Sequence, residues 1–176
     1  SVALVQSGLS DRWWHKAMQT FTFLRNIVDI RADGQTAYKT RYGEDFNGPI
    51  IPFGAGIKYK PSRKSDRDQM AGMGDKMEEA VFCGYKLREG GGWSGDVYVL
   101  DALEMSNAES FKEQYTKTIN ANEITVHKHK NGDFTFPALE EGWRQPADGS
   151  VKMTRRIRKG SRIVMPEEQE VDAEDE

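Results

Sequence analysis

The chain has 176 residues, of which 37% are hydrophobic and 30% are charged, and its formal net charge is −3. This length suggests one domain or two small ones, and the 4 Trp, 6 Tyr and 8 Phe side chains can build a core, which excludes a fully disordered chain. No uncharged run approaches the roughly 20 apolar residues that cross a membrane, so we expect no membrane association. A single cysteine excludes an internal disulfide, and no basic-then-apolar leader is visible, so we expect an intracellular protein that is not secreted.

The N-terminal part of the sequence predicts a helical segment. Residues 1–9 indicate the end of a helix that stops at Gly8, and Ser10 or Asp11 can cap the helix that follows. In that second helix, large apolar residues recur with the period of one helix face. These positions are Trp14, Met18, Phe21, Leu24 and Val28, with Trp13, Ala17 and Ile27 widening the stripe.

After a short helix over 37–42, capped by Thr36 and ended by Gly43, the sequence changes to strand patterns. Apolar or alternating segments bounded by Gly, Pro or Asn-Gly turns predict strands at 50–59, 80–87, 96–103, 123–129 and 133–136. Between the first two strands, residues 60–75 are polar and predict a long loop. Short strands connected by Gly-rich turns are typical of a small β-barrel.

No catalytic or metal-binding set can be assembled from these residues. His127 and His129 share one face of a strand and could ligate a metal, but no third ligand is indicated, and exposed strand residues are the alternative interpretation. Cys83 lies in an apolar strand without a base partner and is interpreted as a buried thiol rather than a nucleophile. The Gly-rich segment 90–95 lacks the Lys-Ser/Thr ending of a phosphate-binding loop and precedes a strand.

Two basic segments are the candidate phosphate contacts, because Lys and Arg neutralise phosphates and release counterions. The candidates are Lys58, Lys60, Arg63, Lys64 and Arg67 in the first segment, and Arg155, Arg156, Arg158 and Lys159 in the second. The alternatives are an ordinary solvated loop and a linker kept soluble by its charge. The last ten residues contain seven acids and no base, so residues 141–176 are expected to form a linker and a disordered, basic-then-acidic tail.

Several short motifs follow one another in a specific order. The first are Trp14 with Ala17, Leu24-Arg25-Asn26, Asp33-Gly34-x-Thr36-x-Tyr38 and Tyr42-Gly43; the later ones are Pro52-Phe53-Gly54 and Val81-Phe82-Cys83-Gly84-Tyr85. In this order they resemble the end of the integrase core in Copia-type (Ty1/copia-like) retrotransposon polyproteins, followed by the FG and FLGY marks of an SH3-like domain. Ala37 and Lys39 replace the proline and glutamate that are usual in that family. The resemblance covers about residues 1–137.

The resemblance implies a parent polynucleotidyl transferase whose Asp-Asp-Glu triad binds two Mg²⁺ or Mn²⁺ ions. The triad lies upstream of the tryptophan helix in that family, so this chain, which lacks the matching positions, is expected to be inactive alone and to hold no cofactor. The implied function is a non-catalytic, DNA-associating fragment involved in DNA integration, in the nucleus or a retrotransposon particle. Its implied partners are DNA, the rest of the polyprotein and a second copy of itself. A protein–protein interaction module, or a decayed transposon remnant without function, are the alternatives.

The expected fold class is α+β: a helical tail of an RNase H-like core, then a small SH3-like β-barrel and a β-hairpin, then the charged tail. The corresponding domains are 1–43, 44–105, 106–140 and 141–176. An aromatic cluster in the helical segment is expected to pack against the missing part of the integrase core. Its members are Trp13, Trp14, Phe21 and Phe23.

Overall fold

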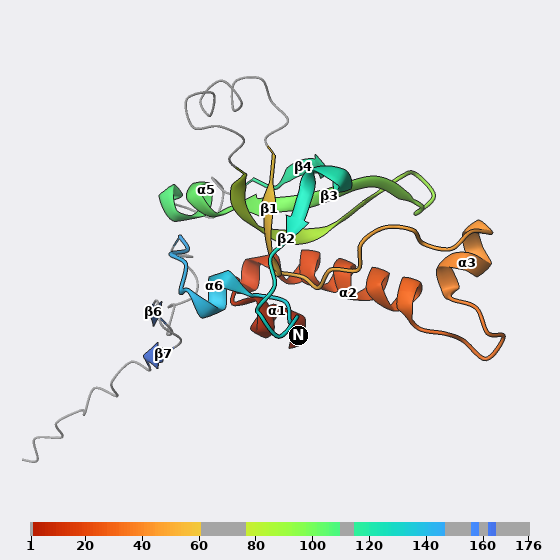
Figure 1. Cartoon of the computed structure of the whole chain (residues 1–176), viewed down its shortest axis with the longest axis horizontal. Coiled ribbons are helices and arrows are strands. Elements are labelled where there is room, and N and C mark those ends of the chain that lie inside the picture. The colour runs from red at the N-terminus through yellow and green to blue at the C-terminus, as the bar shows by residue number, and fades with distance from the viewer. Residues whose placement is uncertain (1, 61–76, 110–114, 147–155, 159–161, 165–176) are drawn as a thin grey trace, which may run out of the picture.

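The computed structural model describes residues 2–60, 77–109, 115–146, 156–158 and 162–164, which form an α+β fold (Figure 1). The helices are α1 (Val2–Ser7), η1 (Asp11–Trp13), α2 (Trp14–Val28), α3 (Ala37–Tyr42), α5 (Ala102–Asn107), η3 (Ala121–Glu123) and α6 (Pro137–Glu140). The strands are β1 (Gly56–Tyr59), β2 (Glu78–Leu87), β3 (Trp93–Asp101), β4 (Lys117–Asn120), β5 (Ile124–Val126), β6 (Arg156–Arg158) and β7 (Arg162–Val164). Within the described ranges, no helix has the length and apolar character needed to cross a membrane.

The first five strands form one antiparallel sheet in the order β4-β3-β2-β1-β5. The sheet is open, but its two edge strands, β4 and β5, follow each other in the chain and are joined only by the three residues of η3. A flat sheet of five strands would separate its edges by about 19 Å, whereas three residues of 3-10 helix span about 6 Å. The sheet is therefore strongly curled, and its two edges approach each other at η3.

Both faces of the curled sheet are buried, as the central strand β2 shows. Ala80 and Phe82 belong to an inner cluster to which all five strands contribute, whereas Val81 and Cys83 belong to an outer cluster formed with the helices. All four side chains are buried, as expected for a continuous apolar run in a strand that is covered on both faces. The predicted central strand and the predicted burial of the Cys83 thiol are therefore confirmed.

Helix α2 runs along the sheet and takes part in both clusters (Figure 1). Trp13, just before its start, and Ala17 pack in the outer cluster, whereas Phe23 and Ile27, near its end, pack in the inner cluster. The predicted division of the chain at residue 43 therefore does not separate two hydrophobic cores. The helical segment and the sheet share both of them.

Only one side of the predicted apolar stripe of α2 packs on the sheet, the side that contains Trp13, Ala17 and Ile27. The buried positions are Trp13, Ala17, Thr20, Phe23 and Ile27, and the exposed ones include Trp14 (60%), Met18 (41%), Phe21 (47%) and Val28 (47%). We call these four exposed residues the α2 stripe. The buried face contains small side chains that allow the helix to approach β2 closely. A Cβ atom added at Gly84 would lie 2.9 Å from the Oγ1 atom of Thr20.

The helix ends follow the sequence signals in part. The Oγ1 atom of Thr36 accepts a hydrogen bond from the Lys39 amide, and Gly43 ends α3 with a φ of +76°, as predicted. Ser10 stands before η1, but its side chain makes no capping bond. Its amide donates instead to Oε1 of Gln145 (2.7 Å), whose Nε2 donates to the Gly8 carbonyl oxygen (2.6 Å). This glutamine therefore fastens the C-terminal segment to the corner between α1 and α2.

Several predicted boundaries after residue 50 need correction. Strand β1 begins only at Gly56, and β4 and β5 pair with β3 and β1, so the sheet extends beyond the predicted limit at residue 105. The hairpin expected at 123–136 is reduced beyond β5 to a bridge between Lys128 and Phe134. Strands β6 and β7 pair with each other inside the segment that was expected to be disordered.

Candidate nucleic-acid interface: a groove beside helix α2

Of the predicted phosphate contacts, only Lys58 and Lys60 have side chains within the part of the chain that the structure describes. Lys58 lies on β1 directly opposite Glu79 of β2 and lines a cavity that also contains Glu78. Lys60 follows the end of β1 and is exposed, and its amide donates to the Glu123 carbonyl oxygen. Of the two predicted lysines that can be placed, Lys58 therefore has an acidic residue opposite it in the sheet.

The other predicted bases divide into two groups. Arg63, Lys64, Arg67, Arg155 and Lys159 lie outside the described residues. Arg156 and Arg158 stand at the two ends of β6, where they pair with Val164 and Arg162 of β7. The position of one basic segment relative to the other therefore cannot be described from these residues.

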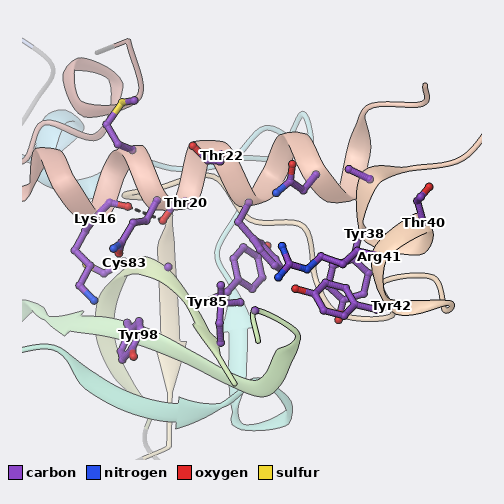
Figure 2. Close-up of a pocket in the computed structure, with 18 of the residues that line it drawn as sticks. Lys16, Thr20, Thr22, Tyr38, Thr40, Arg41, Tyr42, Cys83, Tyr85 and Tyr98 are labelled. Carbon is purple, nitrogen blue, oxygen red and sulfur yellow. Dashed lines mark hydrogen bonds between the residues drawn. The ribbon is translucent and has the colours of Figure 1, made fainter. Parts of the chain in front are cut away.

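A groove of about 960 Å³ lies between α2, α3 and the hairpin of β2 and β3 (Figure 2). Three cationic residues line it, namely Lys16, Arg31 and Arg41. Neutral polar side chains and tyrosines complete the walls, among them Gln19, Thr22, Asn26, Tyr42 and Tyr98. The described residues that line this groove include no Asp and no Glu.

At one end of the groove, Lys16 projects from α2 toward β3 (Figure 2). Its Nζ atom lies 4.0 Å from the centre of the Tyr98 ring, a cation–π contact. The residue is half-buried, and this burial lowers the pKa of the Lys16 ammonium group. The nearby Cys83 thiol is fully buried, which raises its pKa to about 12 and leaves it neutral.

At the other end, α3 is fastened to the hairpin through one carbonyl oxygen (Figure 2). The Nη2 atom of Arg41 and the hydroxyl of Tyr42 both donate to the Gly90 carbonyl, at 3.1 Å and 2.8 Å. The neighbouring Gly91 has a φ of +95°, and a Cβ atom there would lie 2.4 Å from the Tyr42 hydroxyl oxygen. Glycine at this position therefore permits the close approach that holds Arg41 at the rim.

The three groove cations differ from other basic residues of α2 and α3, which form ion pairs with carboxylates. Arg25 of α2 pairs with Asp29 (2.9 Å), and Lys39 of α3 pairs with Asp45 (3.2 Å). Among the described residues, no carboxylate forms an ion pair with any of the three groove cations. The groove therefore concentrates positive charge on a concave surface, which attracts anions.

The tyrosine rings of the groove are already engaged with other side chains. Tyr38 packs against Tyr42 (ring centres 4.7 Å apart) and Tyr85 packs against Phe23 (4.7 Å). Lys16 covers one face of Tyr98. The Tyr85 hydroxyl donates to the Pro49 carbonyl oxygen (2.6 Å), and burial raises the pKa of Tyr85 to about 12. The groove therefore offers cations, hydroxyls and amides to a ligand rather than free aromatic faces.

The predicted aromatic cluster is divided by the structure. Trp13 and Phe23 are buried within this chain, so they are already covered without a further domain. Trp14 and Phe21 are exposed and belong to the α2 stripe. Only these two of the four predicted residues are accessible to a partner.

The histidines form no metal centre in the described part of the chain. The Nε2 atom of His129 lies 3.0 Å from Oε1 of Glu140, and His127 is exposed. The described residues contain no group of three or more His, Cys, Asp or Glu side chains placed to hold a metal ion.

Sequence reasoning missed the three groove cations because they are single bases on separate segments. One signal was available: α2 contains Lys16 and Arg25 but no acidic residue over its 15 positions. Lys16 lies on the flank that carries Gln19 and Asn26, whereas Arg25 lies on the opposite side of the helix and pairs with Asp29. No protein-family model, no curated protein and no solved structure matches the chain.

Proposed function

We propose that this chain is a non-catalytic, DNA-associating module that binds the phosphate backbone in the groove beside α2. The observation that carries the proposal is the combination of Lys16, Arg31 and Arg41 in one cavity whose described lining holds no carboxylate. Such cations neutralise phosphates and release counterions, which gives binding without sequence preference. The engaged tyrosine rings favour contact with the backbone over stacking of bases.

We further propose that the module derives from a Copia-type retrotransposon integrase and that its sheet is an SH3-like barrel. The motif order in the sequence and the strong curl of the five-stranded sheet support this assignment. On this proposal α1 and α2 are the end of the integrase core, and the partners are DNA and the rest of the polyprotein. The place of action is the nucleus or a retrotransposon particle, during DNA integration.

Fluorescence anisotropy with labelled oligonucleotides, tested separately as duplex and as single strand, examines the DNA proposal. If three phosphates are neutralised, the logarithm of affinity should fall with the logarithm of salt concentration at a slope of about −2 to −3. The double variant Arg31→Gln with Arg41→Gln should weaken binding of at least one form by at least tenfold. The matched control is Arg25→Gln with Lys39→Gln, which removes the same charge from bases that already have carboxylate partners.

Two results would contradict the DNA proposal. One is the absence of binding to either form below millimolar concentration. The other is an equal loss of affinity in the groove variant and the control variant, since binding would then depend on net charge and not on the groove.

A second candidate function, a protein–protein interaction module, is favoured by the α2 stripe. Its four apolar side chains lie along one side of an exposed helix, and Trp14 is 60% exposed. Contiguous exposed apolar surface of this kind marks interaction sites. Most of the stripe lies on the flank of α2 opposite to Lys16, but Met18 also lines the groove. Trp14 and Phe21 do not line it, so substitutions at these two positions test the second function separately.

A further inference from the structure

The groove also indicates which form of nucleic acid it accepts, an inference that rests on the proposed function. The cation nearest to the start of α2 does not protrude from the surface. Lys16 is half-buried between the helix and the sheet, and its ammonium group rests on the Tyr98 ring (Figure 2). A ligand must therefore enter the groove to reach it.

The cations are spaced along the groove rather than gathered at one point. Lys16 stands in the first turn of α2, and Arg31 stands three residues beyond its end. The helix from Lys16 to its end at Val28 is about 18 Å long, so an anionic ligand that contacts both cations must be extended. Between these cations the groove is lined by Gln19 and Asn26, whose amides can donate hydrogen bonds to phosphate or sugar oxygens.

A DNA duplex does not match this geometry. It is stiff over about 150 base pairs, and its phosphates lie on a convex outer surface. Exposed side chains such as Arg31 and Arg41 can contact such a surface, whereas Lys16, half-buried and resting on the Tyr98 ring, is less accessible to it. A single strand is thin and flexible enough to follow a groove between a helix and a sheet.

We infer that the groove binds single-stranded nucleic acid through its phosphodiester backbone, and that Lys16 makes a phosphate contact that a duplex does not reach. Burial of Lys16 without a carboxylate partner in the described residues supports this assignment, because a phosphate would supply the missing counter-charge. The 960 Å³ of the groove is within the range of ligand-binding cavities.

The test measures anisotropy of a labelled oligothymidine of about 15 nucleotides and of a duplex of the same length. Lys16→Gln should weaken single-strand binding about tenfold. It should also reduce the steepness of the salt slope by about 0.7, the share of one phosphate on a single strand. Duplex binding should change less than twofold. Lys16→Arg should restore most of the single-strand affinity, and thermal melting of each variant verifies that the fold is retained.

The outcomes separate this inference from the proposed function. If both forms bind and lose equal affinity in Lys16→Gln, the groove binds DNA but does not select a single strand, and the inference is wrong. If Lys16→Gln changes neither form while Arg31→Gln with Arg41→Gln weakens binding, Lys16 makes no phosphate contact and the inference is also wrong. If no groove variant alters binding, the proposed function itself fails.

Discussion

The hydroxyl of Tyr59 donates a 2.7 Å hydrogen bond to Oδ2 of Asp101, and both residues are almost completely buried. The other carboxylate oxygen, Oδ1, accepts from the amides of Leu103 and Glu104 and thereby caps α5. One carboxylate therefore ties β1 to the start of the helix that follows β3. Because all of its bonds are internal, the loss of one leaves a buried polar atom without its partner.

Tyr59→Phe should lower the free energy of unfolding by about 1–3 kcal/mol, since it removes the hydroxyl and leaves Oδ2 of Asp101 without its donor. Urea denaturation followed by tryptophan fluorescence measures this change. Tyr115→Phe is the control, because Tyr115 is 69% exposed and should change stability by less than about 0.5 kcal/mol. Equal stability of the two variants would show that the Tyr59–Asp101 bond contributes nothing.

Stability should fall as the pH rises above about 10. Burial, together with the hydrogen bond to Asp101, raises the pKa of Tyr59, and burial raises the pKa of Tyr85 to about 12. An unfolded tyrosine has a pKa of about 10. Above that value the unfolded chain loses protons that the folded chain retains, so unfolding becomes more favourable with each further step in pH.

Urea midpoints measured between pH 8 and pH 11 test this dependence. The midpoint should begin to decline near pH 8.5, where an unfolded cysteine loses its proton but the buried Cys83 thiol does not, and should decline more steeply above about pH 10. The midpoint of Tyr59→Phe should decline less steeply than that of the parent chain, because one of the two tyrosines with a raised pKa is gone. A flat profile in the parent chain would contradict the prediction.

Gly84→Ala should destabilise the contact between α2 and β2. Gly84 has a φ of +129°, and its added Cβ would lie 2.9 Å from Thr20 Oγ1. Backbone strain and crowding together should cost about 1–3 kcal/mol. Gly132→Ala is the matched control, because Gly132 has a φ of +90° but no atom within 4 Å of the added Cβ. Thermal melting should show a larger loss for Gly84→Ala, and Thr20→Ala should relieve part of it.

The α2 stripe should promote association of the isolated chain. Trp14→Ser with Phe21→Ser removes two exposed aromatic rings and should reduce the mass found by light scattering without lowering the melting temperature. Trp13→Ser, one residue away but only 4% exposed, should instead unfold the chain. A chain that is already monomeric at high concentration would show that the stripe does not drive self-association.

Removal of residues 167–176 should tighten binding to nucleic acid, most strongly at low salt. This segment contains seven acids and no base, and it competes with phosphates for the bases of the chain. Anisotropy titrations of the full and shortened chains at two salt concentrations measure the effect. A difference that persists unchanged at high salt would exclude this electrostatic competition.

The sequence predicted those elements whose local signals are strong. Thr36 and Gly43 delimit α3 through capping chemistry that depends on adjacent residues alone, and the apolar run 80–83 could only be a strand covered on both faces. The orientation of α2 could not be predicted in the same way. Two neighbouring arcs of that helix are apolar, and the choice between them depends on the fit of Thr20 against Gly84, which are 64 positions apart.

The candidate site escaped prediction for a related reason. Lys58 and Lys60 were predicted as phosphate contacts because basic residues are clustered around them in the sequence. The pairing of β1 with β2, however, places Glu79 opposite Lys58. Lys16, Arg31 and Arg41 come from three segments whose convergence depends on the packing of α2 and α3 against the hairpin. Local charge density could not show which bases lack a carboxylate neighbour in space.

Because α2 takes part in both hydrophobic clusters, it cannot unfold locally without disrupting both of them. Separation of this helix from the sheet uncovers Ala17 on one side and Phe23 on the other, so neither cluster can persist by itself. The helix and the sheet should consequently behave as a single cooperative unit, with opening of the α2 amides costing close to the whole free energy of unfolding.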